Sequence, residues 1–484
     1  MTRPDYPPLQ LRIGSRWVDA GDRATLPVVN PADETVLGHL PCATSQDIDA
    51  ALNAARDSFA PWRDTSPVER ARVLRRAAET LREERETLAG LIALELGKPL
   101  REGLKEIETG AGMFEWAAEE GRRAYGRIIP PRNPAYRLNA VPEPVGPVAG
   151  FAGWNAPVIT PARKIAGALA AGCSIIIKPS EATPATALFL ARALAEAGLP
   201  DGVVNLLSGD PAAIAEQLLR SPVTRMVTFT GSTAVGKQLA ALATQSMMRM
   251  VFELGGHAPV LVFPDTDVDA VVKGAVASKY RNSGQVCTSP TRFYVHESVY
   301  PDFVEAFTER AASLRLGDPF SEEAQMGPVQ NPRRLAALQS LVQDARQQGA
   351  TVTTGGEALE GPGFFFQPTV LTNVSDDCRA VSEEPFGPLA MISPFPTTDE
   401  AIALANRLPV GLASYLFTQD TRVVARVSRE IQCGNLSINQ WAASFPETPF
   451  GGVLDSGVGS EGGVEGLQAF QQIKFVSQAP EVAG

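Results

Sequence analysis

Four short apolar segments alternate with helical stretches between residues 148 and 231, and this alternation constrains the fold more than any other feature of the sequence. The segments are VAGFAG, SIIIKP, VVNLLSG and RMVTFTG, and the helices between them are predicted to begin at Pro161, Pro184 and Pro211. Strands joined by crossover helices form a parallel sheet with helices on both faces. The chain is therefore predicted to be an α/β protein.

Polar or glycine residues with chemical potential follow three of these four strands. Trp154 and Asn155 come after the first, Lys178 ends the second, and Gly231 and Ser232 come after the fourth. In open parallel sheets, ligands bind outside the carboxyl ends of the strands. The sequence thus predicts a ligand site at this edge of the sheet.

The rest of the chain predicts a second lobe and a small arm. Residues 258–453 contain the further strands VLVF, TRFYVH, PTVLTNV, LAMISPF and SYLFT. Prolines between residues 130 and 147 indicate a linker or an edge hairpin, and we expect the strand-like segment 468–477 to pair with that hairpin of a neighbouring chain. Ahead of both lobes, short strands in the first 30 residues precede three predicted helices, 45–62, 66–96 and 101–121.

Charge and composition exclude several classes of protein. The 43 Lys and Arg residues are outnumbered by 54 Asp and Glu residues, and the net charge of −11 argues against binding to nucleic acid or an anionic membrane. The apolar run 166–177 is too short to span a bilayer, and the start MTRPDYPPLQ lacks the apolar core of a signal peptide. The five cysteines are widely spaced and the three histidines are isolated, so we expect reduced thiols in a cytoplasmic protein and no bound metal.

Cys287 and Glu253 are the main candidates for catalysis. Cys287 lies in RNSGQVCTSPTR, where small neighbours leave room for a substrate and suit a thiolate nucleophile, although a buried inert thiol explains a lone cysteine equally well. Glu253 lies in VFELGGHAP, where burial would raise its pKa towards that of a general base; an exposed strand-end glutamate is the alternative. A cysteine nucleophile with a separate carboxylate base fits chemistry in which water hydrolyses a thioester.

Two glycine-containing loops are candidates for phosphate binding. GVGSEG at residues 457–462 has the GxGxxG spacing, but it follows no predicted strand and opens no βαβ unit, so we reject it. FTGSTAVGK at residues 229–237 follows a strand and opens a helix, whose free N–H groups favour a pyrophosphate.

These segments together resemble the NAD(P)-dependent aldehyde dehydrogenase superfamily over essentially the whole chain. The shared motifs, in the family's order and spacing, are GWNAP, IIIKPSEATP, FTGSTAVG, FELGGHAP, GQVCTSPTR, EEPFGP and PFGGVLDSG. The segments EEGRRAYGR, KYRNSGQVC and SEGGVEGL are most similar to the branch that acts on succinate semialdehyde and α-ketoglutarate semialdehyde.

The resemblance implies a catalytic set of three residues. Cys287 would attack the aldehyde carbon, and the oxyanion of the thiohemiacetal would be held by the Asn155 amide and the Cys287 backbone N–H. After hydride transfer to the nicotinamide, Glu253 would activate the water that releases the acid. The presence of Glu253 favours this non-acylating reaction over transfer of the acyl group to coenzyme A.

The resemblance also implies a site for NAD. It places Lys178 and Glu181 on the adenosine ribose, Ser232 on the pyrophosphate, Trp154 beside the dinucleotide and Glu384 on the nicotinamide ribose, and the set is completed by Ser180, Gly231, Leu254 and Phe386. A carboxylate at position 181 accepts both ribose hydroxyl protons but repels a 2′-phosphate, so NAD is expected over NADP.

The semialdehyde branch further implies two arginines, Arg163 and Arg281, that would bind a distal carboxylate of the substrate; tying down a loop is their alternative role. Ala156 removes an aromatic wall of the family's tunnel, whereas Trp441 and Phe445 add bulk. We therefore expect oxidation of a carboxylate-bearing aldehyde such as succinate semialdehyde. A broad-specificity or bulky aromatic aldehyde dehydrogenase is the alternative.

The expected domains follow the same resemblance, which implies two Rossmann-like lobes. Residues 1–121 and 145–255 would form the NAD-binding domain and residues 256–453 the catalytic domain. Residues 122–144 and 468–484 would form an oligomerisation arm that joins a homodimer or homotetramer.

Overall fold

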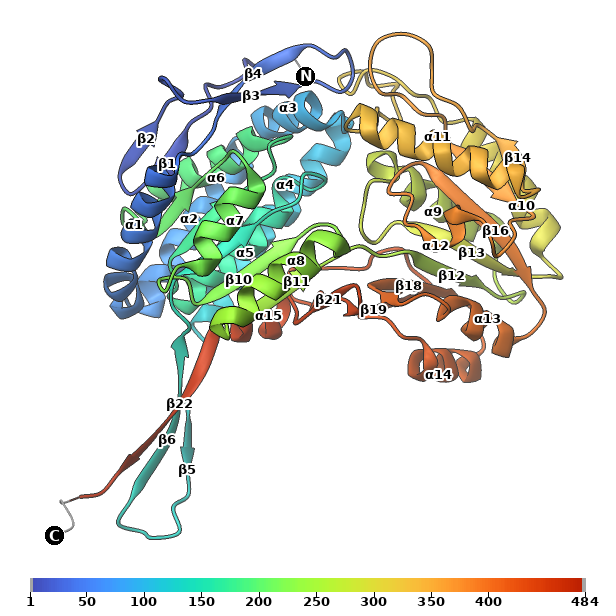
Figure 1. Cartoon of the computed structure of the whole chain (residues 1–484). Coiled ribbons are helices and arrows are strands. Elements are labelled where there is room, and N and C mark those ends of the chain that lie inside the picture. Colours follow the sequence, from blue (N-terminus) through green and yellow to red (C-terminus); the bar gives the residue numbers. More distant parts are fainter. Residues whose placement is uncertain (1–2, 481–484) are drawn as a thin grey trace.

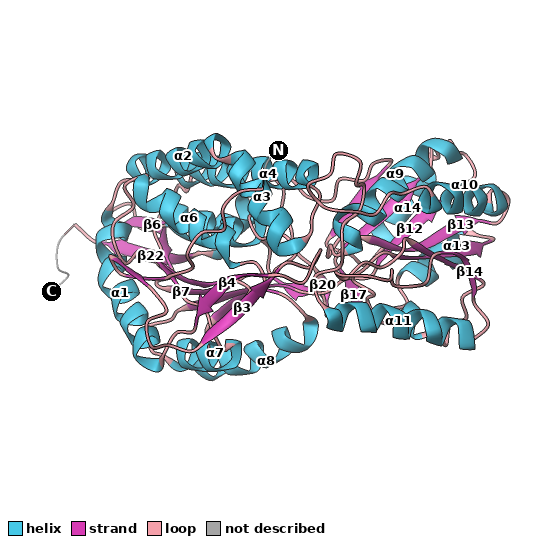
Figure 2. Ribbon diagram, turned by 90° about the horizontal axis from the view of Figure 1, so that it is seen from above, coloured by secondary structure: helices cyan, strands magenta, loops and turns pink. Residues whose placement is uncertain are grey.

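The computed structural model describes residues 3–480 and shows two lobes, each built on a largely parallel sheet, with a slender arm that projects from the first lobe (Figure 1). Helices lie on both sides of each sheet (Figure 2). The predicted α/β architecture is confirmed, and all four strands predicted between residues 148 and 231 are present.

The first lobe contains an eight-stranded sheet in the order β2-β1-β9-β8-β7-β10-β11-β21. Its central strands β9, β8, β7, β10 and β11 are parallel, and the strands β1 and β21 that flank them run antiparallel. The bounds are β1 (Leu11–Ile13), β2 (Arg16–Val18), β7 (Val148–Phe151), β8 (Ile175–Lys178), β9 (Val204–Leu206), β10 (Met226–Thr230), β11 (Arg249–Glu253) and β21 (Gly457–Val458).

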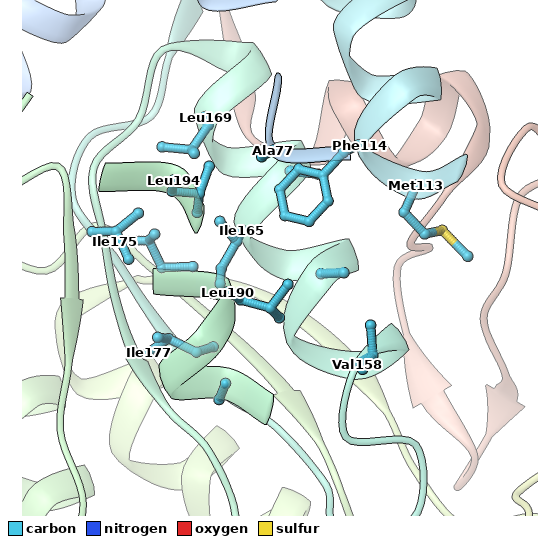
Figure 3. Close-up of a cluster of buried hydrophobic side chains, with 14 of the residues drawn as sticks. Ala77, Met113, Phe114, Val158, Ile165, Leu169, Ile175, Ile177, Leu190 and Leu194 are labelled. Atoms are coloured by element: carbon cyan, nitrogen blue, oxygen red, sulfur yellow. The ribbon is translucent and has the colours of Figure 1, made fainter. Parts of the chain in front are cut away.

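Alternate side chains of β8 show how this sheet is covered. Ile175 and Ile177 pack into a core with helices α2 to α6, part of which is shown in Figure 3, whereas Ile176 packs into a second core with α1, α7 and α8. Both faces of the sheet are therefore buried. The helices are α1 (Ser45–Asp64), α2 (Pro67–Glu83), α3 (Arg85–Leu96), α4 (Leu100–Gly121), α5 (Ile159–Ala171), α6 (Pro184–Glu196), α7 (Pro211–Arg220) and α8 (Thr233–Ala243).

The helix predicted over residues 66–96 is in fact two helices, α2 and α3, separated at Glu84. The reason is a change of surroundings, because α2 buries one face whereas every residue of α3 from 88 to 96 is buried. The bend carries the chain from the surface into the interior. Helix α1 likewise begins one residue earlier than predicted, with Thr44 as its N-cap in a capping box with Asp47.

The second lobe contains a seven-stranded sheet in the order β14-β15-β16-β13-β12-β18-β19, in which only β14 runs antiparallel to its neighbour. Its strands are β12 (Ala258–Val262), β13 (Pro290–His296), β14 (Thr351–Thr354), β15 (Thr369–Thr372), β16 (Leu389–Phe395), β18 (Ala413–Phe417) and β19 (Asn435–Ile438). Its helices are α9 (Val268–Tyr280), α10 (Tyr300–Ala312), α11 (Pro332–Gln347), α12 (Arg379–Ser382), α13 (Thr398–Ala405) and α14 (Thr421–Glu430). Two small hairpins complete the body, β3 (Thr25–Val29) with β4 (Val36–Pro41) and β17 (Val410–Gly411) with β20 (Val453–Leu454).

The arm is a three-stranded antiparallel sheet of β5 (Arg127–Ile129), β6 (Arg137–Pro144) and β22 (Gln471–Gln478). The expected pairing of the C-terminal strand with a neighbouring chain is wrong, since β22 pairs with β6 of its own chain from end to end (Figure 1). The preceding helix α15 (Gly463–Ala469) packs on α4 and α5, and Phe470 accepts a hydrogen bond from the N–H of Val145 at 3.0 Å. The chain thus re-enters the arm directly beside the root of its own hairpin.

Candidate active site

The three residues predicted to be catalytic come from both lobes and lie together. Asn155 follows β7, Glu253 ends β11, and Cys287 lies between the short 3-10 helix η2 (Arg281–Gly284) and β13. The Cys287 thiol forms a hydrogen bond with Glu253. The Asn155 side chain donates a hydrogen bond of 3.1 Å to the carbonyl oxygen of Gln285, two residues before the cysteine.

Burial sets the protonation of this pair. It raises the pKa of Glu253 to about 7, while the hydrogen bond from Cys287 acts in the opposite direction. Burial and the adjacent carboxylate raise the pKa of the Cys287 thiol. Within residues 3–480, the Oε1 atom of Glu253 is buried without a hydrogen-bond partner. A carboxyl group that titrates near neutrality, with one free oxygen, is suited to accept a proton from the thiol or from water.

Behind Glu253 lies a buried ion pair that the sequence analysis did not identify. The ammonium of Lys164 contacts the carboxylate of Glu461 and donates hydrogen bonds to Thr228 at 3.1 Å and Thr230 at 2.8 Å. The positive charge of Lys164 lowers the pKa of Glu253, and the negative charge of Glu461 raises it. The signal was available in part, because Lys164 directly follows Arg163 on a helix that ends a predicted strand's loop.

Arg163 projects from α5 towards the same region. Its guanidinium lies 4.3 Å from the ring centroid of Phe450 and donates a hydrogen bond to Ser444. Its Nε–H is buried and has no partner within the described part of the chain. Burial lowers the pKa of Arg163, and the charges of Glu461, Glu253 and Cys287 act on it. The arginine therefore lies within electrostatic reach of the nucleophile, with one donor available.

The other residues predicted to bind substrate are placed differently. Arg281 is exposed at the end of α9. The ring of Trp441 packs on Phe417, with centroids 4.5 Å apart, and so closely over Gly274 that a Cβ there would lie 2.1 Å from its Nε1. Phe445 is 42% exposed. Trp441 thus anchors its loop on the second lobe, whereas Phe445 stands at the surface.

The residues predicted to bind the adenosine ribose lie at the carboxyl end of β8. Lys178 and Glu181 form an ion pair, and the Lys178 ammonium also donates a hydrogen bond of 3.0 Å to the carbonyl oxygen of Pro179. Ser180 accepts a hydrogen bond of 3.2 Å from the N–H of Ala182, which fixes the turn between them. The carboxylate and the ammonium are therefore held side by side at one strand end.

The predicted pyrophosphate loop presents the N-terminus of α8. Ser232 is exposed and caps the helix. Gly231 is required by packing, since a Cβ there would lie 2.4 Å from the ring of Phe229. Beneath the helix, Leu254 is buried against Gly236 and donates its N–H to the carbonyl oxygen of Ser456 at 2.9 Å. The free N–H groups of an exposed helix start suit an anionic phosphate.

A second group of predicted cofactor residues comes from the loop before β16. Phe386 meets Trp154 edge to face, with ring centroids 5.4 Å apart. Glu384 accepts a hydrogen bond of 3.3 Å from the N–H of Gly256, and burial raises its pKa to about 8. The loop of the second lobe thereby reaches the strand-end residues of the first.

The rejected loop at residues 457–462 lies against the base. Strand β21 within it pairs antiparallel with β11, so that Gly457 is opposite Glu253. Gly457 has φ +152°, and a Cβ there would lie 2.2 Å from the carbonyl oxygen of Phe252. Its glycines allow close packing of two strands.

Among residues 3–480, no cluster of three or more His, Cys, Asp and Glu side chains is arranged to hold a metal ion. In the same part of the chain, no helix has the length and apolar character needed to cross a membrane.

Comparison with known proteins identifies the family. The family model described as "Aldehyde dehydrogenase family" matches residues 17–476. A 4-(hydroxymethyl)benzenesulfonate dehydrogenase of Comamonas testosteroni is 45% identical over 96% of this chain and 97% of its own. The succinate-semialdehyde dehydrogenase [NADP(+)] of Escherichia coli is 38% identical over 96% and 97%. The crystal structure of succinate-semialdehyde dehydrogenase from Burkholderia pseudomallei superimposes with a TM-score of 0.96, at 40% identity, over 99% of both chains. The protein belongs to the aldehyde dehydrogenase family, oxidoreductases that act on aldehydes with NAD or NADP.

Proposed function

We propose that this aldehyde dehydrogenase oxidises an aldehyde bearing a distal anionic group, with NAD as the hydride acceptor. The observation that carries the proposal is Arg163, whose buried Nε–H has no partner within residues 3–480 and whose charge acts on Cys287 and Glu253. A buried arginine with a free donor is stabilised by an anion that completes its hydrogen bonds. A carboxylate or sulfonate at the far end of the substrate supplies that anion.

The names of relatives support an anionic substrate without fixing its skeleton. One is named for succinate semialdehyde, which carries a carboxylate, and another for a benzenesulfonate. An arginine recognises both head groups by the same charge-assisted hydrogen bonds. Ala156 leaves space near the nucleophile, so an aromatic aldehyde acid is the second candidate beside the aliphatic semialdehyde.

The chemistry proposed for the catalytic residues follows from their contacts. Glu253 takes the proton of the Cys287 thiol, and the thiolate attacks the aldehyde carbon. The Asn155 amide uses one N–H on Gln285, and its second N–H, with the N–H of Cys287, stabilises the oxyanion. NAD, when bound, accepts the hydride that leaves a thioester on Cys287. Glu253 then removes a proton from water, which hydrolyses the thioester and releases the acid.

The residues present fit a dinucleotide. The exposed N-terminus of α8 provides N–H groups for a pyrophosphate, and Lys178 with Glu181 lies at the neighbouring strand end. We assign NAD binding to residues 1–121 and 145–255, and catalysis to residues 256–453. Because the Glu181 carboxylate would repel a 2′-phosphate, we propose NAD over NADP, in contrast to the relative named for NADP(+).

The arm is proposed to join two or four copies of this chain. Ile128, Ile473 and Phe475 on the arm are 86%, 65% and 60% exposed. Apolar side chains in such a row favour burial against a second copy. Light scattering coupled to size exclusion should give a dimer or tetramer for the wild type, and a monomer would refute this assignment.

The substrate proposal is tested by measuring NADH formation with matched pairs of aldehydes. Succinic semialdehyde is compared with butanal, and 4-formylbenzenesulfonate with benzaldehyde, for the wild type, Arg163→Met, Arg281→Met and Cys287→Ala. We expect the anionic member of at least one pair to be favoured about 10- to 100-fold in kcat/KM, an advantage that Arg163→Met removes. Cys287→Ala should be inactive on all four.

Equal rates on charged and neutral aldehydes would assign the arginines a structural role and favour a broad-specificity enzyme. The aliphatic and aromatic pairs then distinguish the two skeletons. NADP in place of NAD, with the better aldehyde, tests the cofactor assignment.

A further inference from the structure

Lys98 is a buried lysine next to the predicted oxyanion residue. It lies between α3 and α4 and is 6% exposed. Its ammonium contacts the carboxylate of Glu106 and donates a hydrogen bond of 3.1 Å to the backbone carbonyl oxygen of Asn155. Lys98 thus touches the main chain of Asn155 from the side opposite to the nucleophile's loop.

Glu106 holds the same segment by its other oxygen. Its Oε1 accepts hydrogen bonds from the N–H groups of Val158 at 2.8 Å and Ile159 at 3.5 Å, where α5 begins. The Lys98 and Glu106 pair therefore binds both a carbonyl and the N–H groups of the turn 155–159. Such a pair fixes the position of this turn in two directions.

A second contact joins this turn to the loop of Cys287. The side-chain amide of Asn282 donates to the carbonyl oxygen of Asn155 at 3.0 Å and to that of Gln285 at 3.1 Å. The backbone N–H of Asn282 donates to Glu102 on α4 at 2.7 Å. Asn282 and Ser283 both have left-handed backbone conformations, with φ of +48° and +54°, which makes the loop strained and narrowly defined.

We infer that Lys98 is a positioning residue that acts through Asn155. The carbonyl of Asn155 accepts hydrogen bonds from Lys98 and Asn282, and its side chain donates to Gln285. With these contacts made, the amide has one orientation, and its remaining N–H points to where the oxyanion forms. The inference rests on the proposed function, since it assumes that Asn155 stabilises that oxyanion.

The alternative role of Lys98 is simply to neutralise the buried Glu106. The double variant Lys98→Met/Glu106→Gln separates the two roles, because it removes both charges and keeps an oxygen that can accept from Val158. If Lys98 only balances charge, the double variant restores wild-type kcat. If Lys98 positions Asn155, kcat stays low in both variants while the double variant regains thermal stability.

The experiment measures kcat, NAD affinity by fluorescence titration and the alkylation rate of Cys287 by iodoacetamide. Lys98→Met should lower kcat about 10- to 100-fold, because a small displacement of a catalytic group has an effect of this size. Alkylation forms a carbon–sulfur bond without an oxyanion, so its rate should stay within about twofold, as should the affinity for NAD. The exposed Lys105→Met on α4 is the matched control and should retain wild-type kcat.

A double-mutant cycle with Asn155→Ala decides the pathway of the effect. Asn155→Ala should lower kcat about 100-fold or more, and adding Lys98→Met should then change it by less than about threefold. Multiplicative losses, slowed alkylation or full recovery in Lys98→Met/Glu106→Gln would each overturn the inference. Wild-type kcat in Asn155→Ala would refute the proposed function itself, whereas a loss there with none in Lys98→Met would refute only the role of Lys98.

Discussion

The two sides of Cys287 differ in how completely their buried polar groups are hydrogen-bonded. On the side of α4, Lys98, Glu106 and Asn282 all have partners on the turn around Asn155. On the opposite side, Glu253 and Arg163 each keep one buried polar atom without a partner within residues 3–480. Both sides are equally enclosed, so burial alone does not explain the difference.

Buried polar atoms without partners are rare because each one costs about 1–3 kcal/mol. The bonded side holds backbone in place, and its groups have no capacity left for a ligand. The open side contains the groups to which we assign water activation and recognition of the substrate. Unfilled hydrogen-bonding capacity therefore separates groups that react from groups that support them.

The largest effect is expected from breaking the bonded ion pair behind Glu253. Lys164→Met leaves the Glu461 carboxylate buried without its cation, which should destabilise the protein by about 3–5 kcal/mol. Chemical denaturation at pH 8 measures this loss. Since Lys164 lowers the pKa of Glu253, the variant should also shift the rising limb of the kcat–pH profile to higher pH. An unchanged denaturation midpoint would remove the distinction between the two sides.

Glu253→Gln tests the open side and should have opposite effects on stability and activity. The folded pKa of Glu253, about 7, exceeds its ordinary value, so ionisation above neutral pH destabilises the native state. The variant should therefore be more stable than the wild type by up to about 3 kcal/mol at pH 8, and the gap should close as the pH falls below 5. Its kcat should fall about 100-fold or more, and the wild-type rise through pH 7 should disappear. A variant that is less stable at pH 8 would contradict this account.

The smallest effect is expected on the surface, where hydrogen bonding is complete in water. Glu216 and Arg220 form an exposed i,i+4 pair on α7. Glu216→Ala should change the free energy of unfolding by about 0.5 kcal/mol or less, and the difference should shrink in 1 M salt. Its kcat should equal that of the wild type. A loss above 2 kcal/mol would show that exposure is a poor guide to the weight of an ion pair here.

Much of the fold could be predicted because local pattern and tertiary role agree. The strands from Val148 to Thr230 are short, apolar and buried on both faces, so their period and length were sufficient. Asn155, Lys178 and Ser232 could be identified because parallel strands deliver their carboxyl ends to one edge. The break at Glu84 could not be predicted, because residues on both sides of it have good helical patterns.

The supporting residues could not be identified from the sequence because they act across long separations. Lys98 contacts a residue 57 positions away, and Arg163 contacts Ser444 across 281 positions. Each is an ordinary basic residue on or beside a helix, and the sequence favours the interpretation of a solvated side chain. The strand partner of β22 was missed for a related reason, since pairing within the arm depends on where α15 docks.

The two left-handed residues before the nucleophile have a consequence for how the enzyme uses energy. Left-handed backbone at non-glycine residues costs about 1–2 kcal/mol each, and Asn282 and Ser283 are consecutive. They are held by hydrogen bonds to Glu102 in the first lobe and to the carbonyl oxygen of Gly327. The cost of bending this loop is incurred once, when the lobes assemble, and no catalytic cycle repeats it. The nucleophile is thereby presented in its working geometry before any aldehyde arrives.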